Sequence, residues 1–173
     1  MHIRVERVYD AIDKYELRII MKVLENKIPP PLVGLLVALG MWGLSTVSPI
    51  ILLTNTVKTM LVIAFISIGI FFDLAGVISF RMAKTTVNPL KPNTASSLVT
   101  SGIYQVTRNP MYVGFVAFLL AWASYLGSAW GLTLIPLYML YIQHFQIAPE
   151  ERALTALFKE EFTQYKAKVR PWL

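Results

Sequence analysis

The sequence predicts an all-α integral membrane protein that forms a single domain over residues 1–173, with about four transmembrane helices. Of its 173 residues, 55% are hydrophobic and only 15% are charged, whereas soluble domains carry about a quarter charged residues. The charges are clustered, and the apolar runs between the clusters reach the roughly 20 residues that a helix needs to cross a bilayer. The basic residues gather in the segments that alternate with these runs.

The N-terminal half predicts one surface helix and two spans. Residues 1–27 place apolar side chains at helical spacing with charged residues between them, which is typical of an amphipathic helix on the membrane surface, its basic residues near the lipid headgroups. Residues 31–53 contain no charged residue, and residues 57–80 contain only Lys58 and Asp73. Both of these runs are long enough to cross a bilayer.

The C-terminal half predicts a hairpin between two polar segments. Residues 81–110 are rich in Thr, Ser, Asn and Pro and are too irregular to lie in lipid. The apolar run 111–147 is too long for one crossing, and a break at Gly127 and Ser128 would divide it into two short helices. Residues 148–173 follow as a charged, amphipathic helical segment. Its expected apolar face comprises Leu154, Leu157, Phe158, Phe162 and Tyr165.

The distribution of basic residues predicts the orientation in the membrane. Fifteen of the 16 basic residues lie in residues 1–27, 81–110 and 148–173, and only Lys58 lies elsewhere. Cytosolic segments of membrane proteins carry an excess of Lys and Arg, so both termini and the 81–110 connection are expected in the cytosol. The net charge of +6 is therefore explained by basic residues that face the cytosol beside the membrane. We expect no nucleic acid partner.

The composition also excludes several kinds of site. The chain has no cysteine, so a disulfide framework, a thiolate nucleophile and a cysteine-based metal site are impossible. Its two histidines, His2 and His144, are far apart in the sequence, and we expect no metal site. The Gly-x-Gly-x-x-Gly pattern of dinucleotide-binding Rossmann domains is absent.

Two polar segments flank the predicted hairpin and are therefore expected to meet on its cytosolic side. The first contains LVTSGIY at residues 98–104 and RNPMYVG at residues 108–114. The second begins with Glu150 and Glu151 and ends with Val-Arg-Pro-Trp at residues 169–172. Together they would form an enclosed site of hydroxyl groups, carboxylates, an arginine and aromatic rings at the membrane edge.

These motifs resemble the isoprenylcysteine carboxyl methyltransferase superfamily, which includes phospholipid methyltransferases and small bacterial relatives. The resemblance extends from about Lys84 to the C-terminus. It implies a membrane enzyme that binds S-adenosyl-L-methionine on the cytosolic side, beneath the C-terminal segment. It further implies a bacterial or archaeal cell membrane and a membrane lipid or another hydrophobic molecule as methyl acceptor.

The resemblance also implies roles for particular residues. The cofactor-binding positions that it carries over are Ser97, Leu98, Val99, Tyr104, Asn109, Pro110, Met111, Tyr112 and Glu150. Arg108 has the chemistry to bind the methionine carboxylate in a bidentate manner. An acceptor that carries a proton would need a general base, and Glu151 and Tyr112 are the candidates for this catalytic role. Otherwise the alignment of acceptor, methyl group and sulfur supplies much of the rate.

Two positions depart from the family pattern, and several alternatives follow from them. Asn109 stands where histidine is usual, and it has no titratable proton. Gln146 stands where prenylcysteine enzymes carry an arginine for the substrate carboxylate, which argues against prenylcysteine as the acceptor. A non-catalytic protein with the same fold and an enzyme for a small thiol or amine are the alternatives. A transporter or channel subunit is disfavoured because Asp73 is the main polar residue inside the spans.

Overall fold

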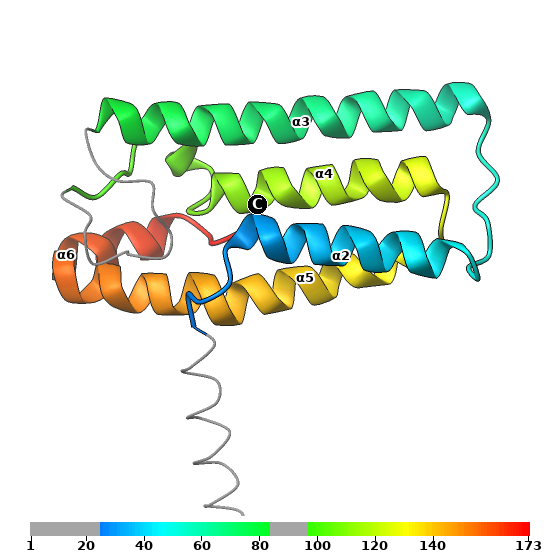
Figure 1. Ribbon diagram of the computed structural model, residues 1–173. Helices are drawn as coiled ribbons and strands as arrows, with labels where there is room; N and C mark the ends of the chain where they lie inside the picture. Colours follow the sequence, from blue (N-terminus) through cyan, green and yellow to red (C-terminus); the bar gives the residue numbers. More distant parts are fainter. Residues whose placement is uncertain (1–24, 84–96) are drawn as a thin grey trace, which may run out of the picture.

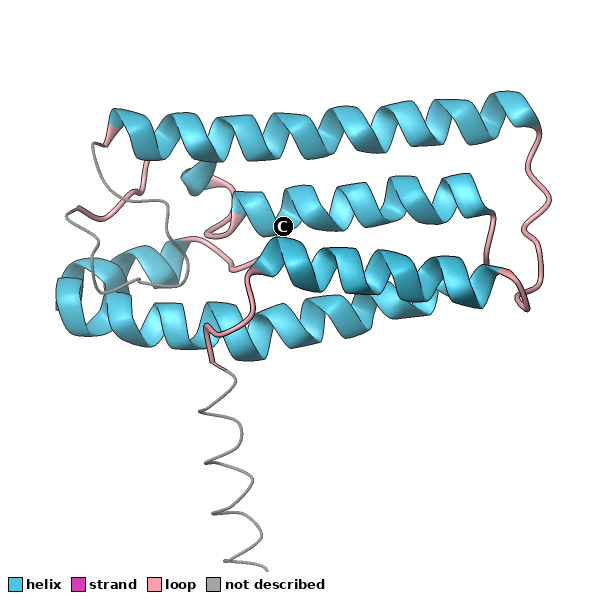
Figure 2. Cartoon of the chain, viewed as in Figure 1, coloured by secondary structure: helices cyan, strands magenta, loops and turns pink. Residues whose placement is uncertain are grey.

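The computed structural model describes residues 25–83 and 97–173, and all the regular elements in these two ranges are helical (Figures 1 and 2). The helices are α2 (Pro30–Ser45), α3 (Asn55–Met82), α4 (Pro110–Leu126), α5 (Leu134–Ile142) and α6 (Ala148–Lys168). Three short elements complete them: the 3₁₀ turns η2 (Gly102–Gln105) and η3 (Gly131–Thr133), and the π-helical turn η4 (Gln143–Ile147). The predicted surface helix 1–27 lies almost entirely outside the described residues, as does part of the 81–110 connection.

Helices α2 to α5 lie side by side and alternate in direction, as Figure 1 shows. Their apolar faces meet in one core whose most buried members include Met41 of α2, Tyr138 of α5 and Ile142 of α5. A hydrogen bond also links α4 to α2, because the indole N–H of Trp122 donates to the carbonyl oxygen of Ala38 at 3.0 Å. The all-helical prediction is therefore confirmed for the described residues.

The first apolar helix ends earlier than the sequence predicted. A helix was expected over residues 31–53, but α2 ends at Ser45. At this end of the helix, the hydroxyl groups of Ser45 and Thr46 donate to the backbone carbonyl oxygens of Trp42 and Gly43. Pro49 then disfavours a helical conformation at the residue before it. Hydropathy alone could not reveal this end, because residues 50–53 are as apolar as the helix.

The loop after α2 is tied to the loop between α4 and α5. Helix α4 ends at Gly127, whose left-handed backbone (φ 63°) favours glycine. This is the position where the sequence suggested a break. The backbone N–H of Ile51 donates to the Gly127 carbonyl oxygen at 2.8 Å, and that of Ala129 donates to Pro49 at 3.3 Å. The two loops therefore close the same end of the bundle.

At the opposite end, α5 continues through η4 into α6 without a break. Because Pro149 has no N–H, the carbonyl oxygen of Phe145 in the preceding turn lacks its helical donor, and it accepts instead from the backbone N–H of Asn26 at 3.0 Å. The chain then reverses at Lys159, the one non-helical residue inside α6, with φ 47° and ψ −116°. Of the five residues expected on one apolar face, four pack in one hydrophobic cluster: Leu154 and Phe158 before the reversal, and Phe162 and Tyr165 after it. Leu157 is exposed.

Helices α3 and α4 approach each other closely because glycines line their contact. Gly69 and Gly76 of α3 are buried there, together with Gly114 of α4. A Cβ atom at Gly114 would collide with Oδ1 of Asp73 and would lie 3.0 Å from the carbonyl oxygen of Gly69. A Cβ atom at Gly69 would collide with the ring of Phe118. Small residues thus set the distance between the two helices, as is common where helices pack inside membranes.

The outer faces of the bundle are apolar. Exposed side chains on α3 include Met60, Ile63 and Phe71, and Leu36 and Trp42 of α2 are exposed as well. Among the described helices, α3 is long and apolar enough to cross a membrane, and α2 and α4 are shorter apolar helices. An apolar surface of this extent marks a region that lies against lipid or another partner.

We predict that Gly114→Ala lowers the free energy of unfolding by about 1–3 kcal/mol, because the added methyl group has no room between α4 and α3. Gly43→Ala is the matched control: no atom lies within 4 Å of its added Cβ, and replacing a helical glycine stabilises by about 0.5–1 kcal/mol. Reversible unfolding in mixed micelles measures both variants. Equal stability of the two would contradict the close α3–α4 contact.

Candidate active site

A cavity of about 350 Å³ lies at the end of the bundle where α3 ends and α4 begins. Its walls come from α3, the segment 97–104, the start of α4 and both halves of α6, with two prolines at the start of α2. Ten of the eleven site residues predicted from the sequence line it: Ser97, Leu98, Val99, Tyr104, Arg108, Asn109, Met111, Tyr112, Glu150 and Glu151. The exception is Pro110, which is buried at the start of α4 and packs near Gly76. Residues from three separated segments therefore meet around one space.

Glu150 lies in the first turn of α6 and borders the cavity. The hydroxyl group of Tyr112 donates a hydrogen bond to its carboxylate. Burial, and to a smaller extent the negative charge of Glu151, raise the pKa of Glu150 from 4.5 to about 7, although the hydrogen bond from Tyr112 lowers it in part. The carboxyl group is therefore poised to change its charge near neutral pH and to ionise fully when a cation lies beside it.

Aromatic rings form one wall of the cavity. The rings of Phe80 and Tyr104 meet edge to face with their centroids 5.3 Å apart. Tyr165, on the reversed part of α6, donates from its hydroxyl group to the carbonyl oxygen of Tyr104 at 2.7 Å. Burial raises the pKa of Tyr104, and the nearby charge of Glu150 raises it further, so this phenol stays protonated. Phe162 completes this cluster and is 2% exposed.

Sequence reasoning had not assigned Phe80, Phe162 and Tyr165 to the site, although all three line the cavity. Phe80 had been placed at the end of a span, and the other two on the apolar face of an amphipathic helix. Apolar residues at helical spacing look the same whether they face a protein core or a ligand cavity. No signal in the sequence separated these two roles.

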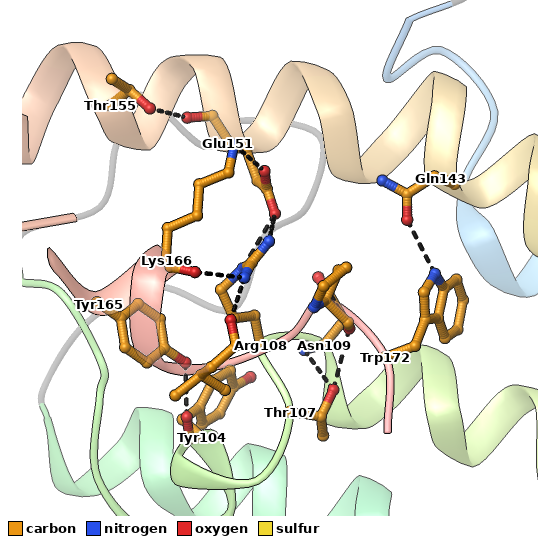
Figure 3. A network of polar contacts seen from close by, with 12 residues as sticks. Tyr104, Thr107, Arg108, Asn109, Gln143, Glu151, Thr155, Tyr165, Lys166 and Trp172 are labelled. Carbon is orange, nitrogen blue, oxygen red and sulfur yellow. Dashed lines mark hydrogen bonds and ion pairs between the residues drawn. The ribbon is translucent and has the colours of Figure 1, made fainter. Parts of the chain in front are cut away.

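Arg108 and Glu151 are bound to each other. The Nε atom of Arg108 donates to Oε1 of Glu151 at 3.0 Å, and Lys166 approaches the other carboxylate oxygen at 2.8 Å (Figure 3). A second guanidinium nitrogen donates to the carbonyl oxygens of Lys166 and Val169. The side chains of the Arg108–Glu151 pair are only 8% and 14% exposed. The guanidinium group therefore has its donors engaged within the protein, and both oxygens of Glu151 face cations.

The same stretch of chain holds the C-terminal tail. Thr107 and Asn109 both donate from their side chains to the carbonyl oxygen of Pro171, at 3.0 and 2.9 Å (Figure 3). The backbone N–H of Arg108 donates to the Arg170 carbonyl oxygen at 2.9 Å. Trp172 then donates from its indole N–H to Gln143 at 2.8 Å. Asn109 does not cap α4 with its side chain, because that amide is used to hold the tail.

Gln146, the second departure from the family pattern, lies in η4 and is fully buried. Its side-chain N–H donates to the carbonyl oxygen of Ile28 at 2.8 Å. It is not among the residues that line the cavity. In this chain the position ties η4 to the segment before α2 and supplies no charge to the site.

Asp73 of α3 also lines the cavity. Its Oδ1 atom is buried and has no hydrogen-bond partner among the described residues. Tyr138 of α5, whose hydroxyl group likewise has no partner there, lies within electrostatic range of Asp73. Buried polar atoms without partners are rare in proteins, so this end of the cavity is suited to a polar ligand group.

We expect Arg108→Ala to lower the free energy of unfolding by about 3 kcal/mol, because it leaves the mostly buried Glu151 without its main partner. Hydrogen exchange over residues 160–172 should accelerate at the same time, since the tail loses its anchor. Arg152→Ala is the control. Arg152 forms an ion pair with Glu25 but is 58% exposed, so its loss should cost less than about 1 kcal/mol. Similar effects of the two substitutions would show that the tail is held in another way.

Comparison with known proteins identifies the family. Residues 57–161, more than half of the chain, match the phospholipid methyltransferase family. An uncharacterized protein of Haemophilus influenzae is 41% identical over 63 residues, which is 36% of this chain and the whole of that protein. Protein-S-isoprenylcysteine O-methyltransferase of Schizosaccharomyces pombe is 28% identical over 107 residues, which is 62% of this chain and 45% of that protein.

The chain thus spans less than half the length of the S. pombe enzyme. No solved structure matches. The resemblance seen in the sequence motifs is confirmed by the family match, which covers α3, α4, α5 and most of α6. The chain belongs to the phospholipid methyltransferase family, within the superfamily that includes the isoprenylcysteine carboxyl methyltransferases.

Proposed function

We propose that this chain is an integral membrane methyltransferase that uses S-adenosyl-L-methionine and methylates a lipidic or otherwise hydrophobic acceptor at the cytosolic face. The observation that carries the proposal is the convergence of ten predicted site residues on one cavity. They come from segments that are separated in the chain, and the family match gives the class of reaction.

The chemistry of the cavity fits this cofactor. A carboxylate whose pKa lies near neutrality, Glu150, suits the positive charge of a sulfonium or ammonium group. The rings of Tyr104, Phe80 and Phe162 can stack on adenine or hold a cation. When bound, the cofactor supplies a methyl group that is already activated by the positive charge on sulfur.

The protein's own residues would bind the reactants, orient them and exclude water. Tyr112 orients the Glu150 carboxylate through its hydrogen bond. The Arg108–Glu151 pair acts as a positioning element, because it holds the reversed part of α6 and the tail over the cavity. Alignment of the reacting atoms in a dry cavity supplies much of the rate of such a transfer. Glu151 is less suited to act as a base than Glu150, since both of its carboxylate oxygens are already engaged, one with Arg108 and the other with Lys166.

The apolar outer faces of the bundle support the proposal that α2 to α5 make four membrane crossings. Helix α3, with 28 residues, is about 42 Å long, and α2, with 16, is about 24 Å long. The described basic residues near the cavity end include Arg108, Lys166 and Arg170, whereas Lys58 lies toward the other end. This asymmetry supports a cytosolic cavity.

The depth of the cavity favours a hydrophobic acceptor. Asp73 lines the cavity nine positions before the last residue of α3, which corresponds to about 14 Å along the helix. If the cytosolic end of α3 lies at the interface, this part of the cavity lies at the depth of the hydrocarbon chains. A small thiol or amine that enters from water is the second candidate for the acceptor.

Calorimetry of purified protein in nanodiscs tests the cofactor site. We expect S-adenosylmethionine and S-adenosylhomocysteine to bind, and Glu150→Gln to weaken binding by about tenfold because a charge-assisted contact is lost. Glu161→Gln is the control, since Glu161 is exposed on α6 and does not line the cavity. Absence of binding by folded wild-type protein would overturn the proposal and favour the non-catalytic alternative.

The pH dependence of the same titration is a second prediction. The pKa of Glu150 is raised to about 7, so the protonated carboxyl group stabilises the folded, ligand-free protein below the unfolded pKa, and this contribution is lost as the pH rises through about 7. A cationic ligand binds the ionised form. Its affinity should therefore increase from about pH 5.5 to about pH 7.5 and then level off. Glu150→Gln should remove this rise, and a rise that persists in the variant would assign it to another group.

Single cysteines test the orientation, because the chain has none of its own. Leu52→Cys lies in the loop after α2, at a side chain that is 93% exposed, and Lys168→Cys lies at the end of α6. A membrane-impermeant maleimide applied to intact cells should label Leu52→Cys and should label Lys168→Cys only after the cells are opened. The reverse pattern would place the cavity on the outer face.

A further inference from the structure

We propose that the basic side chains at the end of α6 and in the tail bind the headgroups of anionic phospholipids in the cytosolic leaflet. These side chains are Lys166, Lys168 and Arg170, and we call them the basic patch. The inference rests on the orientation given in the proposed function and goes beyond it, because it names a lipid partner other than the methyl acceptor. It is carried by the exposure of the patch, by its balance of charge and by its level in the bundle.

The basic patch is available to a partner outside the protein. Lys168 and Arg170 are exposed, and neither forms an ion pair with any of the described residues. The backbone of Arg170 is nevertheless fixed, because its carbonyl oxygen accepts from the N–H of Arg108. Lys166 contacts Glu151, but its side chain remains 50% exposed. The fold thus holds the backbone at these positions and leaves the cationic groups accessible.

Charge is unevenly distributed along the reversed half of α6 and the tail. Glu160 and Glu161 directly follow the reversal, whereas the last three charged side chains of the segment are those of the basic patch. Among the described residues, the acidic side chain in contact with the patch is Glu151, which also binds Arg108. Four basic side chains therefore face one acidic side chain, a local net charge of +3. Such an excess attracts the negatively charged surface of a cytosolic leaflet.

The tail lies at the level where the helices would leave the membrane. It is hydrogen-bonded to residues 107–109, directly before the first residue of α4. Trp172 donates from its indole to Gln143 and packs against the apolar core, as is typical of tryptophan at a membrane interface. Arg170 is therefore at the depth of the headgroups. Its guanidinium group has the geometry to bind a phosphate in a bidentate manner.

Headgroup binding would act on the cavity as well, because the patch belongs to a segment that covers it. Phe162 and Tyr165 lie on the same reversed half of α6 and line the cavity. The segment begins at the turn at Lys159 and is held near its end by the hydrogen bonds to Pro171. Phospholipids bound to the patch would add contacts to this segment in its present position. Its backbone amides should then exchange more slowly with solvent.

Native mass spectrometry of the detergent-purified protein measures the binding directly. Dioctanoyl-phosphatidylglycerol and dioctanoyl-phosphatidylcholine are the probes, because they share their acyl chains and differ in net charge. We expect wild-type protein to bind the anionic lipid about tenfold more tightly, since each exposed basic side chain contributes to the attraction. Lys168→Gln combined with Arg170→Gln should remove this preference, because it removes two cations and keeps the backbone hydrogen bond of residue 170.

The matched control is Lys58→Gln combined with Arg152→Gln, which lowers the net charge by the same amount. Lys58 lies over the ring of Tyr125 toward the other end of the bundle, and Arg152 is already paired with Glu25. The control should keep the preference for the anionic lipid. An excess of inorganic phosphate should leave the lipid bound. Complete displacement would indicate a site for free phosphate and would overturn docking to the membrane surface.

Hydrogen exchange in nanodiscs provides a second readout. Amides of residues 160–172 should exchange at least about threefold more slowly with phosphatidylglycerol present than in phosphatidylcholine alone, and the variant at Lys168 and Arg170 should lose this difference. Equal binding of the two lipids by wild-type protein, or the same loss of preference in both double variants, would overturn the inference. If the variant at Lys168 and Arg170 does not fold, the wild-type preference and its persistence in the control decide. Absence of S-adenosylhomocysteine binding with the lipid preference intact would instead overturn the proposed function alone.

Discussion

The ion pair between Arg108 and Glu151 joins the start of α4 to the first part of α6, and the arrangement of the site depends on it. The same guanidinium group reaches the carbonyl oxygens of Lys166 and Val169, beyond the reversal of the chain at Lys159. One side chain therefore fixes both halves of α6 against the RNP segment. Phe162 and Tyr165 lie on the reversed half, so the contacts of Arg108 with the carbonyl oxygens of this half help to hold the aromatic wall of the cavity in place.

Adjacent glutamates of α6 face different surroundings for a simple geometric reason. Successive residues of an α-helix point about 100° apart, so Glu150 and Glu151 cannot face the same neighbours. Glu151 forms ion pairs with Arg108 and Lys166. Glu150 meets Tyr112 and apolar walls, and burial raises its pKa to about 7. Glu151 thus makes structural contacts, whereas Glu150 lines the cavity without an ion-pair partner among the described residues.

The glycine contacts between α3 and α4 shape the part of the cavity wall that α3 supplies. Close packing at Gly69 and Gly114 brings the backbones together and leaves room for one side chain, the carboxylate of Asp73. A cavity built in this way combines a deep acidic group with apolar surroundings.

The sequence by itself determined the all-helical class, the family and most of the residues around the cavity, because hydropathy and short motifs are local properties of the chain. It did not determine where α2 ends, since residues 50–53 remain apolar after the helix stops. It also did not reveal that α5 continues into α6 or that the chain reverses at Lys159. The engagement of Arg108 with Glu151 rather than with a ligand was decided by the tertiary structure, because 43 residues separate the two in the chain and only the folded hairpin and tail bring them together.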